Sequence, residues 1–217
     1  MGRSARDGVS ERLEIETPGG PARATLDAPR GSAGLLVLGH GAGGGIAAPD
    51  LLAAQAAALE CGLAVARVEQ PYRVAGRRSP APARQLDLAW VAVVGELRGI
   101  AAADGPLLVG GRSSGARVAC RTAAVVGADG VLCLAFPLTP PARRGVDPDS
   151  PRPSRLAELD AVEVPLLVVQ GRSDRFGLPA PADAREVVVV EGDHGLKQDL
   201  EGVRLAVEIW LRARRFG

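Results

Sequence analysis

A serine in a glycine-rich segment is the first candidate for chemistry in this chain. Gly111-Arg112-Ser113-Ser114-Gly115 has the G-x-S-x-G spacing of a nucleophile elbow, a sharp strand-to-helix turn that lifts a serine hydroxyl above a sheet. An apolar run at 106–109 precedes it and an Ala/Val-rich stretch at 116–126 follows it, as this turn requires. The alternative is an idle serine in a β–α turn, because 28 glycines make the spacing common by chance.

A serine hydroxyl becomes a good nucleophile only when an imidazole accepts its proton and a carboxylate orients that imidazole. The chain has two histidines, and His194 follows a Val-rich run at 186–190. We predict that His194 is the base. The alternative is an ordinary polar histidine in a surface loop.

Asp174 is the predicted acid, because it follows the apolar run 165–170 in the segment Arg-Ser-Asp-Arg. The order Ser, Asp, His matches the triad order of one class of serine hydrolases. Asp147 and Asp149 in a Pro-rich loop are the alternative acids. Asp193 is unsuitable, because a residue adjacent to His194 in the sequence is poorly placed to bind its imidazole. A turn-forming aspartate is the other interpretation of Asp174.

The loop 40–45 follows a third apolar run and is rich in glycine. Backbone N–H groups in such a loop, together with the N–H that follows the nucleophile, stabilise a developing oxyanion. We predict Ala42 and Ser114 as the two donors. Gly43 is an alternative first donor and a predicted substrate contact.

The same loop also supports a competing interpretation. Gly39 to Gly44 fits G-x-G-x-x-G, and Glu69 ends the next predicted strand, where it could bind a ribose. Against a dinucleotide site, the loop follows two earlier strands instead of opening a β–α–β unit. That interpretation also leaves Ser113, Asp174 and His194 unexplained, so we expect no cofactor.

Four further side chains near these loops are candidates for substrate contact. Tyr72 and Arg73 follow the strand at 63–68, and we expect them to line the cleft, with an ordinary Pro-Tyr turn as the alternative. Arg112 and Arg117 flank the elbow and could bind an anion, although a salt bridge within the turn is the commoner role for such arginines.

The elements that position these residues follow from hydrophobic periodicity. Alternation at 12–16 and 22–26 predicts an antiparallel hairpin, after which apolar strands alternate with amphipathic helices. This alternation predicts a mostly parallel α/β sheet of about eight strands with helices on both faces. The predicted strands are 35–38, 63–68, 107–110, 130–136, 165–170 and 186–190, and the predicted helices are 50–60, 83–103, the elbow helix, 154–159 and 197–214.

Length and composition limit the function. The 217 residues suit one domain over 11–217 after a disordered tail at 1–10. A net charge of +1 and 3% aromatic residues argue against a nucleic-acid partner. No apolar stretch is long enough to span a membrane, and Cys61, Cys120 and Cys133 lack metal-site or disulfide spacing. We therefore expect a cytoplasmic protein with core cysteines and no metal.

These motifs resemble the α/β-hydrolase superfamily, and more narrowly the hydrolase-like domain shared by a testis-expressed protein family and a regulatory subunit of the NSL histone-acetyltransferase complex. The similar segments are 40–44, 110–117, 136–138, 171–174 and 193–194. The resemblance implies a small hydrolase without a folded lid, with Ser113, Asp174 and His194 as nucleophile, acid and base. We add Leu138 to the predicted substrate-binding residues. Dienelactone hydrolases have a similar size, but they carry cysteine at the elbow.

The sequence thus predicts a serine hydrolase of small carboxylic esters or thioesters that acts through an acyl-enzyme. The alternative is a protein-interaction module on a retained hydrolase fold, with a protein partner or a second copy of the chain as its ligand. An interaction module has no physical need for all three triad groups.

Overall fold

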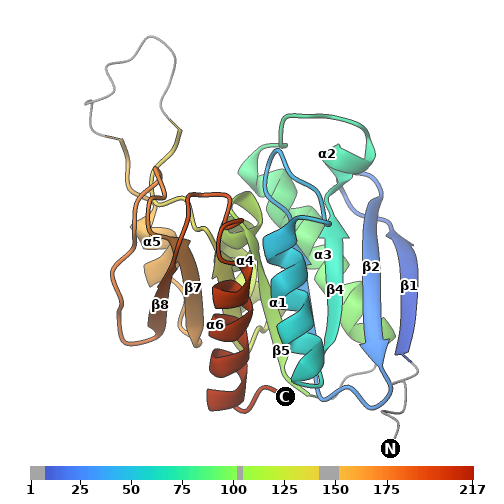
Figure 1. Ribbon diagram of the computed structural model, residues 1–217. Coiled ribbons are helices and arrows are strands. Elements are labelled where there is room, and N and C mark those ends of the chain that lie inside the picture. Colours follow the sequence, from blue (N-terminus) through green and yellow to red (C-terminus); the bar gives the residue numbers. More distant parts are fainter. Residues whose placement is uncertain (1–7, 102–104, 142–151) are drawn as a thin grey trace, which may run out of the picture.

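The computed structural model describes residues 8–101, 105–141 and 152–217. Their strands form one sheet in the order β1-β2-β4-β3-β5-β6-β7-β8 (Figure 1). β1 and β2 pair antiparallel, β2 pairs antiparallel with β4, and all other neighbours are parallel. The strands are β1 (Gly8–Ile15), β2 (Ala22–Pro29), β3 (Leu35–Gly39), β4 (Ala64–Glu69), β5 (Leu107–Arg112), β6 (Gly130–Leu134), β7 (Leu166–Gly171) and β8 (Arg185–Val190).

The central strands are apolar because helices cover both of their faces. Every residue of β3, β6 and β7 is buried. One face carries α1 (Pro49–Glu60) and α6 (Leu200–Ala213), which lie side by side in front of the sheet in Figure 1. The opposite face carries α3 (Ala83–Ala101) and α4 (Ser114–Val126), together with the short helices α2 (Pro71–Val74) and α5 (Leu156–Asp160).

The predicted fold class is confirmed as a mostly parallel α/β sheet with helices on both faces. Because β3, β5, β7 and β8 run in the same direction, the loops that leave them meet at one edge of the sheet. Ser113, Asp174 and His194 all lie in these loops. The segment 137–153 is irregular where it is described, at 137–141 and 152–153, and its residues 142–151 lie outside the described residues.

Several predicted boundaries were wrong. The tail was expected to reach Ser10, but β1 begins at Gly8 because Gly8 to Ser10 pair with Asp27 to Pro29; residues 1–7 lie outside the described residues. β6 ends at Leu134 instead of continuing to 136, since the chain turns at Ala135 with a φ of 49°. α6 begins at Leu200 instead of 197. Asp199 caps this helix, because its side chain accepts a hydrogen bond from the N–H of Gly202 at 2.8 Å.

Candidate functional site

The turn between β5 and α4 holds Ser113 in a strained backbone conformation. Its φ is 52°, in the left-handed region that residues with side chains rarely adopt. Such a conformation costs about 1–3 kcal/mol and persists only where the surrounding structure enforces it. The N–H of Ser113 donates a hydrogen bond of 2.9 Å to the carbonyl oxygen of Leu134 in β6. Ser113 is thereby fixed at the end of β5, where the elbow motif predicted it.

The two glycines of the motif are explained by close backbone packing. A Cβ atom on Gly111 or on Gly115 would collide with the carbonyl oxygen of Gly39 in β3. A Cβ on Gly115 would also lie 2.9 Å from the carbonyl oxygen of His40. The G-x-S-x-G spacing therefore lets α4 leave the sheet directly above β3.

The predicted nucleophile, base and acid lie in one chain of hydrogen bonds. His194 Nε2 is 2.9 Å from Ser113 Oγ, and His194 Nδ1 is 2.8 Å from Asp174 Oδ2. A neutral imidazole that donates its Nδ1 proton to the carboxylate accepts the serine proton at Nε2. The Phe176 ring packs edge-on against the imidazole with centroids 4.4 Å apart, which limits rotation of the base.

Asp174 is held by three donors in a buried environment. Its side chain is fully buried, its Oδ1 accepts the N–H of Phe176 at 2.9 Å, and its Oδ2 accepts Gln170 Nε2 at 2.8 Å as well as His194. The two amide protons of Gln170, on β7, are shared between Asp174 and the carbonyl oxygens of Phe136 and Gly177. These donors keep the carboxylate aimed at the imidazole.

Of the two predicted oxyanion donors, Ser114 adjoins Ser113 in the sequence and Ala42 lines the same cavity as Ser113. Ser114 is the first residue of α4, so its N–H has no acceptor within the helix. Among the described residues, the N–H groups of Ala42 and Gly43 donate no hydrogen bond either. Tyr72 Oη donates to the carbonyl oxygen of Ala42 at 3.0 Å, and a turn from Gly41 to Gly44 further orders this loop.

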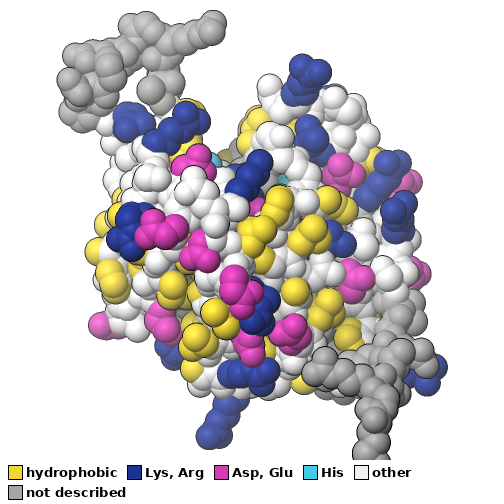
Figure 2. Space-filling model, viewed as in Figure 1, with side chains coloured by type: hydrophobic (Ala, Val, Ile, Leu, Met, Phe, Trp, Pro, Cys, Tyr) yellow, Lys and Arg dark blue, Asp and Glu magenta, His cyan; other side chains and the backbone are white. Residues whose placement is uncertain are grey.

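Ser113, His194, Ala42 and Gly43 line a cavity of about 700 Å³ at the carboxyl edge of the sheet, together with eleven other residues. Figure 2 shows this edge as a hollow in the surface where histidine is visible, with basic side chains on both sides of it. The hollow gives a small molecule access to the Ser113 hydroxyl.

Comparison with known proteins assigns the family. A family model described as an α/β hydrolase domain matches residues 32–206. The chain belongs to the α/β hydrolase family. A search of curated proteins finds no match to its sequence.

Solved structures support the same fold for this α/β hydrolase. It matches an α/β serine hydrolase without a lid from Xanthomonas campestris, with 21% identity over 94% of each chain and a TM-score of 0.74. It matches Est1E from Butyrivibrio proteoclasticus with 18% identity, over 95% of this chain and 99% of that one, and a TM-score of 0.72. A dienelactone hydrolase from Anabaena variabilis is 15% identical over 95% and 98% of the chains, with a TM-score of 0.73. The narrower resemblance to the testis-expressed family stays a prediction.

Three predicted substrate contacts do not line the cavity in the described part of this α/β hydrolase. Tyr72 is buried behind the loop 41–44, where it supports Ala42 instead of facing the hollow. Arg73 lies beside it on α2 and is half-buried. Leu138 packs near Gly177, behind the acid loop. Gly43 does line the cavity, and the alternative acids Asp147 and Asp149 lie outside the described residues.

Arg112 faces the cavity but is paired with a carboxylate of the protein. Its Nε lies 2.9 Å from Asp50 Oδ2, and its Nη2 donates to the carbonyl oxygen of His194 at 3.0 Å. Burial raises the pKa of the Asp50 carboxyl, and the Arg112 guanidinium opposes this shift. Arg112 therefore forms a salt bridge, as expected, but its partner lies on α1 and not within the turn.

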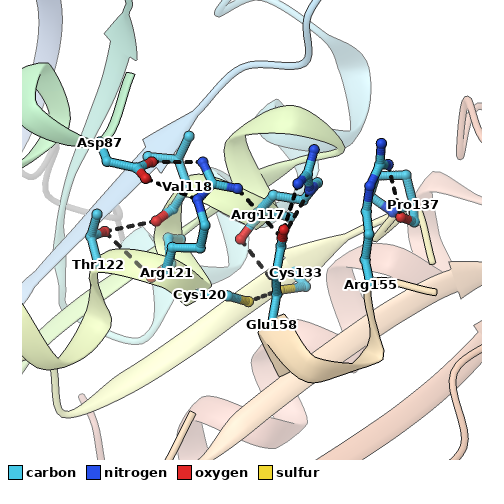
Figure 3. A network of polar contacts seen from close by, with 12 residues as sticks. Asp87, Arg117, Val118, Cys120, Arg121, Thr122, Cys133, Pro137, Arg155 and Glu158 are labelled. Carbon is cyan, nitrogen blue, oxygen red and sulfur yellow. Dashed lines mark hydrogen bonds and ion pairs between the residues drawn. The ribbon is translucent and has the colours of Figure 1, made fainter. Parts of the chain in front are cut away.

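Arg117 does not line the cavity and lies in a polar network with Arg121 and Glu158 (Figure 3). Its guanidinium binds both carboxylate oxygens of Glu158 on α5, and Arg121 bridges Asp87 on α3 to the same glutamate. The network links α3, α4 and α5, so it stabilises the helix that begins at the elbow.

His40 has a structural role in the loop after β3. Its Nδ1 lies 2.8 Å from the carbonyl oxygen of Gly41, and its Nε2 accepts the N–H of Gln70 at 3.2 Å. Burial lowers the pKa of His40, which favours the neutral ring that this pair of hydrogen bonds requires. His40 thus connects the predicted oxyanion loop to the end of β4.

The sequence analysis missed Gln170 and Asp50. Gln170 is the single polar residue in the apolar run of β7, immediately before the acid loop, and that position was the available signal. Asp50 resembles an ordinary first-turn acid of α1, and nothing in its local sequence indicates that Arg112 reaches it.

The three cysteines are free and buried, as predicted, and Cys120 Sγ lies 3.4 Å from Cys133 Sγ. None of the described helices combines the length and hydropathy needed to cross a bilayer. The described residues contain no cluster of three metal-ligating side chains.

Proposed function

We propose that this α/β hydrolase is a serine hydrolase of small carboxylic esters or thioesters, with Ser113 as nucleophile, His194 as general base and acid, and Asp174 as the orienting carboxylate. The observation that carries the proposal is the pair of hydrogen bonds from Ser113 Oγ through His194 to Asp174, at 2.9 and 2.8 Å. The predicted alternatives, a dinucleotide-binding loop or an interaction module, require no such alignment.

The chemistry runs in two halves. Ser113 Oγ attacks the carbonyl carbon while His194 Nε2 takes the hydroxyl proton, and the protonated imidazole then gives that proton to the departing alcohol or thiol. The acyl group remains on Ser113. Water then attacks the acyl carbon, again losing its proton to His194, and the carboxylic acid departs as Ser113 recovers the proton.

The developing oxyanion receives two hydrogen bonds in this mechanism, one from the N–H of Ser114 and one from the N–H of Ala42 or Gly43. The positive end of α4 lies at the same place and favours negative charge. Removing one donor of this type typically costs about 100- to 1,000-fold in kcat.

The open hollow of about 700 Å³ has the size of a small-molecule site. The buried free thiols fit a reducing compartment, which supports the cytoplasmic location expected from the sequence.

The test is labelling with a fluorophosphonate probe, followed by mass spectrometry of the modified peptide. We expect one adduct, on Ser113, and none in Ser113→Ala. Ser114→Ala is the matched control, because it removes the neighbouring hydroxyl and keeps the backbone N–H, and it should still be labelled. No adduct on the folded protein, or an adduct on another residue, contradicts the proposal.

A further inference from the structure

The cavity around Ser113 carries an excess of positive charge. Its lining includes three cations, Arg112, Arg175 and Lys197, and a single anion, Asp50. The carboxylate of Asp50 is held 2.9 Å from the guanidinium of Arg112, so these two charges balance each other. The positive charges of Arg175 and Lys197 are left without a counter-charge among the described lining residues.

These two cations come from the loops that carry the predicted acid and base. Arg175 follows Asp174 directly, and Lys197 lies three residues after His194. Both side chains are exposed, and neither makes an ion pair with a described carboxylate. The Arg175 guanidinium stacks over the Phe176 ring, 4.9 Å from its centroid, and the imidazole of His194 packs against the same ring with centroids 4.4 Å apart. Arg175 and His194 thus share Phe176 as a neighbour.

Lys197 also stands out by its residue type. It is the only lysine among 26 basic residues, and it lines this cavity. A lysine ammonium is a mobile point charge that can follow a ligand, whereas an arginine side chain presents a rigid fork.

We propose that Arg175 and Lys197 bind a carboxylate carried by the substrate, so that the preferred substrates are anionic esters or thioesters. The proposal rests on the serine hydrolase function proposed above. Cations at the mouth of a cleft concentrate anions there and raise the rate of productive encounter. The carboxylate belongs to the part of the substrate that lies toward the β7 and β8 loops.

A carboxylate suits this site better than a phosphate. Phosphate sites usually combine several cations with free backbone N–H groups at a helix N-terminus. Two helices begin at this cavity. The free N–H at the start of α4 serves the oxyanion in the proposed mechanism, and α1 begins with Pro49, which has no N–H. The second residue of α1 is the buried Asp50, whose carboxylate would repel a phosphate at that position.

The test compares two esters that differ in one charge, mono-p-nitrophenyl adipate and its methyl ester. The free carboxyl group is ionised at about pH 7.5, since such groups titrate about three units lower. We expect kcat/KM to be about ten-fold higher for the charged ester at low ionic strength. The ratio should fall toward one in about 0.5 M NaCl, because salt screens exposed charges.

Lys197→Gln removes one positive charge, so it should lower the ratio of kcat/KM for the charged ester to that for the neutral ester about three-fold. Lys197→Glu reverses the charge, so it should bring this ratio below one. The ratio corrects each variant for any general loss of activity. Arg98→Gln is the control, because Arg98 is an exposed basic residue in the last turn of α3 and does not line the cavity. It should keep the wild-type ratio.

The outcomes separate the two proposals. If the neutral ester is hydrolysed and the charged ester is no better, or if the ratio is the same in Lys197→Glu as in the wild type, the carboxylate site is wrong and the serine hydrolase function stands. A phosphate-bearing ester preferred over the adipate ester also overturns the carboxylate site. Hydrolysis of neither ester overturns both proposals.

Discussion

Arg112 donates a hydrogen bond from its guanidinium to the backbone carbonyl oxygen of His194, across 82 positions of sequence. The same guanidinium is paired with Asp50 at the start of α1. One side chain, adjacent to Ser113, therefore connects the first helix, the elbow and the loop that carries His194. The contribution of the Arg112–Asp50 pair to the free energy of unfolding can be measured.

We predict that Arg112→Met lowers the free energy of unfolding by about 3 kcal/mol, because it leaves the Asp50 charge buried without a partner. Asp50→Asn should cost less, since the Arg112 side chain remains 18% exposed whereas that of Asp50 is 1% exposed. In the double variant the two losses should not add, because the second change relieves the first. Urea unfolding of all four proteins measures this.

Arg172→Met is the control for that cycle. Its ion pair with Glu191 is exposed on both sides, so its loss should cost about 0.5 kcal/mol or less. Additive losses at Arg112 and Asp50 would show that the two side chains act independently.

Ser113→Ala should reduce hydrolysis of p-nitrophenyl acetate by several powers of ten, because only the nucleophile is removed. The melting temperature and circular dichroism spectrum should show a folded protein. Near-normal turnover by folded Ser113→Ala would remove Ser113 from the mechanism.

Asp174→Asn should lower kcat by about 10⁴-fold, since an amide in this position favours the wrong imidazole tautomer. Asp147→Asn and Asp149→Asn, at the alternative acids of the sequence analysis, should change kcat much less. A larger loss at Asp147 would move the acid to that earlier loop.

The succession of strands and helices along the chain and the placing of Ser113, Asp174 and His194 after strands were predictable because they depend on local patterns, namely apolar runs and the turns that end them. The contacts that organise the site were not. Tyr72 resembles a cleft residue, yet it folds back under Ala42, and Asp50 reaches Arg112 from another helix. Such contacts depend on how distant elements pack, and one-dimensional periodicity carries no information about that.

His40 predicts a specific pH dependence of stability. Burial lowers its pKa in the folded state, so the unfolded chain binds the proton more readily. The contribution of neutral His40 to the free energy of unfolding is therefore complete above the unfolded-state pKa of 6.5. It is lost as the pH falls toward the lower pKa of the folded state. The free energy of unfolding should fall more steeply from about pH 7 to 5 in the wild type than in His40→Asn. Equal slopes in the wild type and in His40→Asn would show that a group other than His40 causes the pH dependence.

The glycine loop 39–44 should not bind a dinucleotide, because the adjacent helix α1 begins with a proline and a buried aspartate. We expect no change in melting temperature with about 1 mM NAD(H) or NADP(H), whereas a ligand of the native state would raise it. A saturable rise would assign a nucleotide site to this loop.

The left-handed backbone conformation of Ser113 sets stability against the retention of a serine during evolution. Glycine adopts that conformation without strain, so Ser113→Gly should unfold at a higher temperature than Ser113→Ala even though neither has a nucleophile. Stability alone would favour glycine at this position. Under the proposed function, selection for turnover retains the serine, and a lineage that lost the need for hydrolysis would be free to exchange it for a more stable residue.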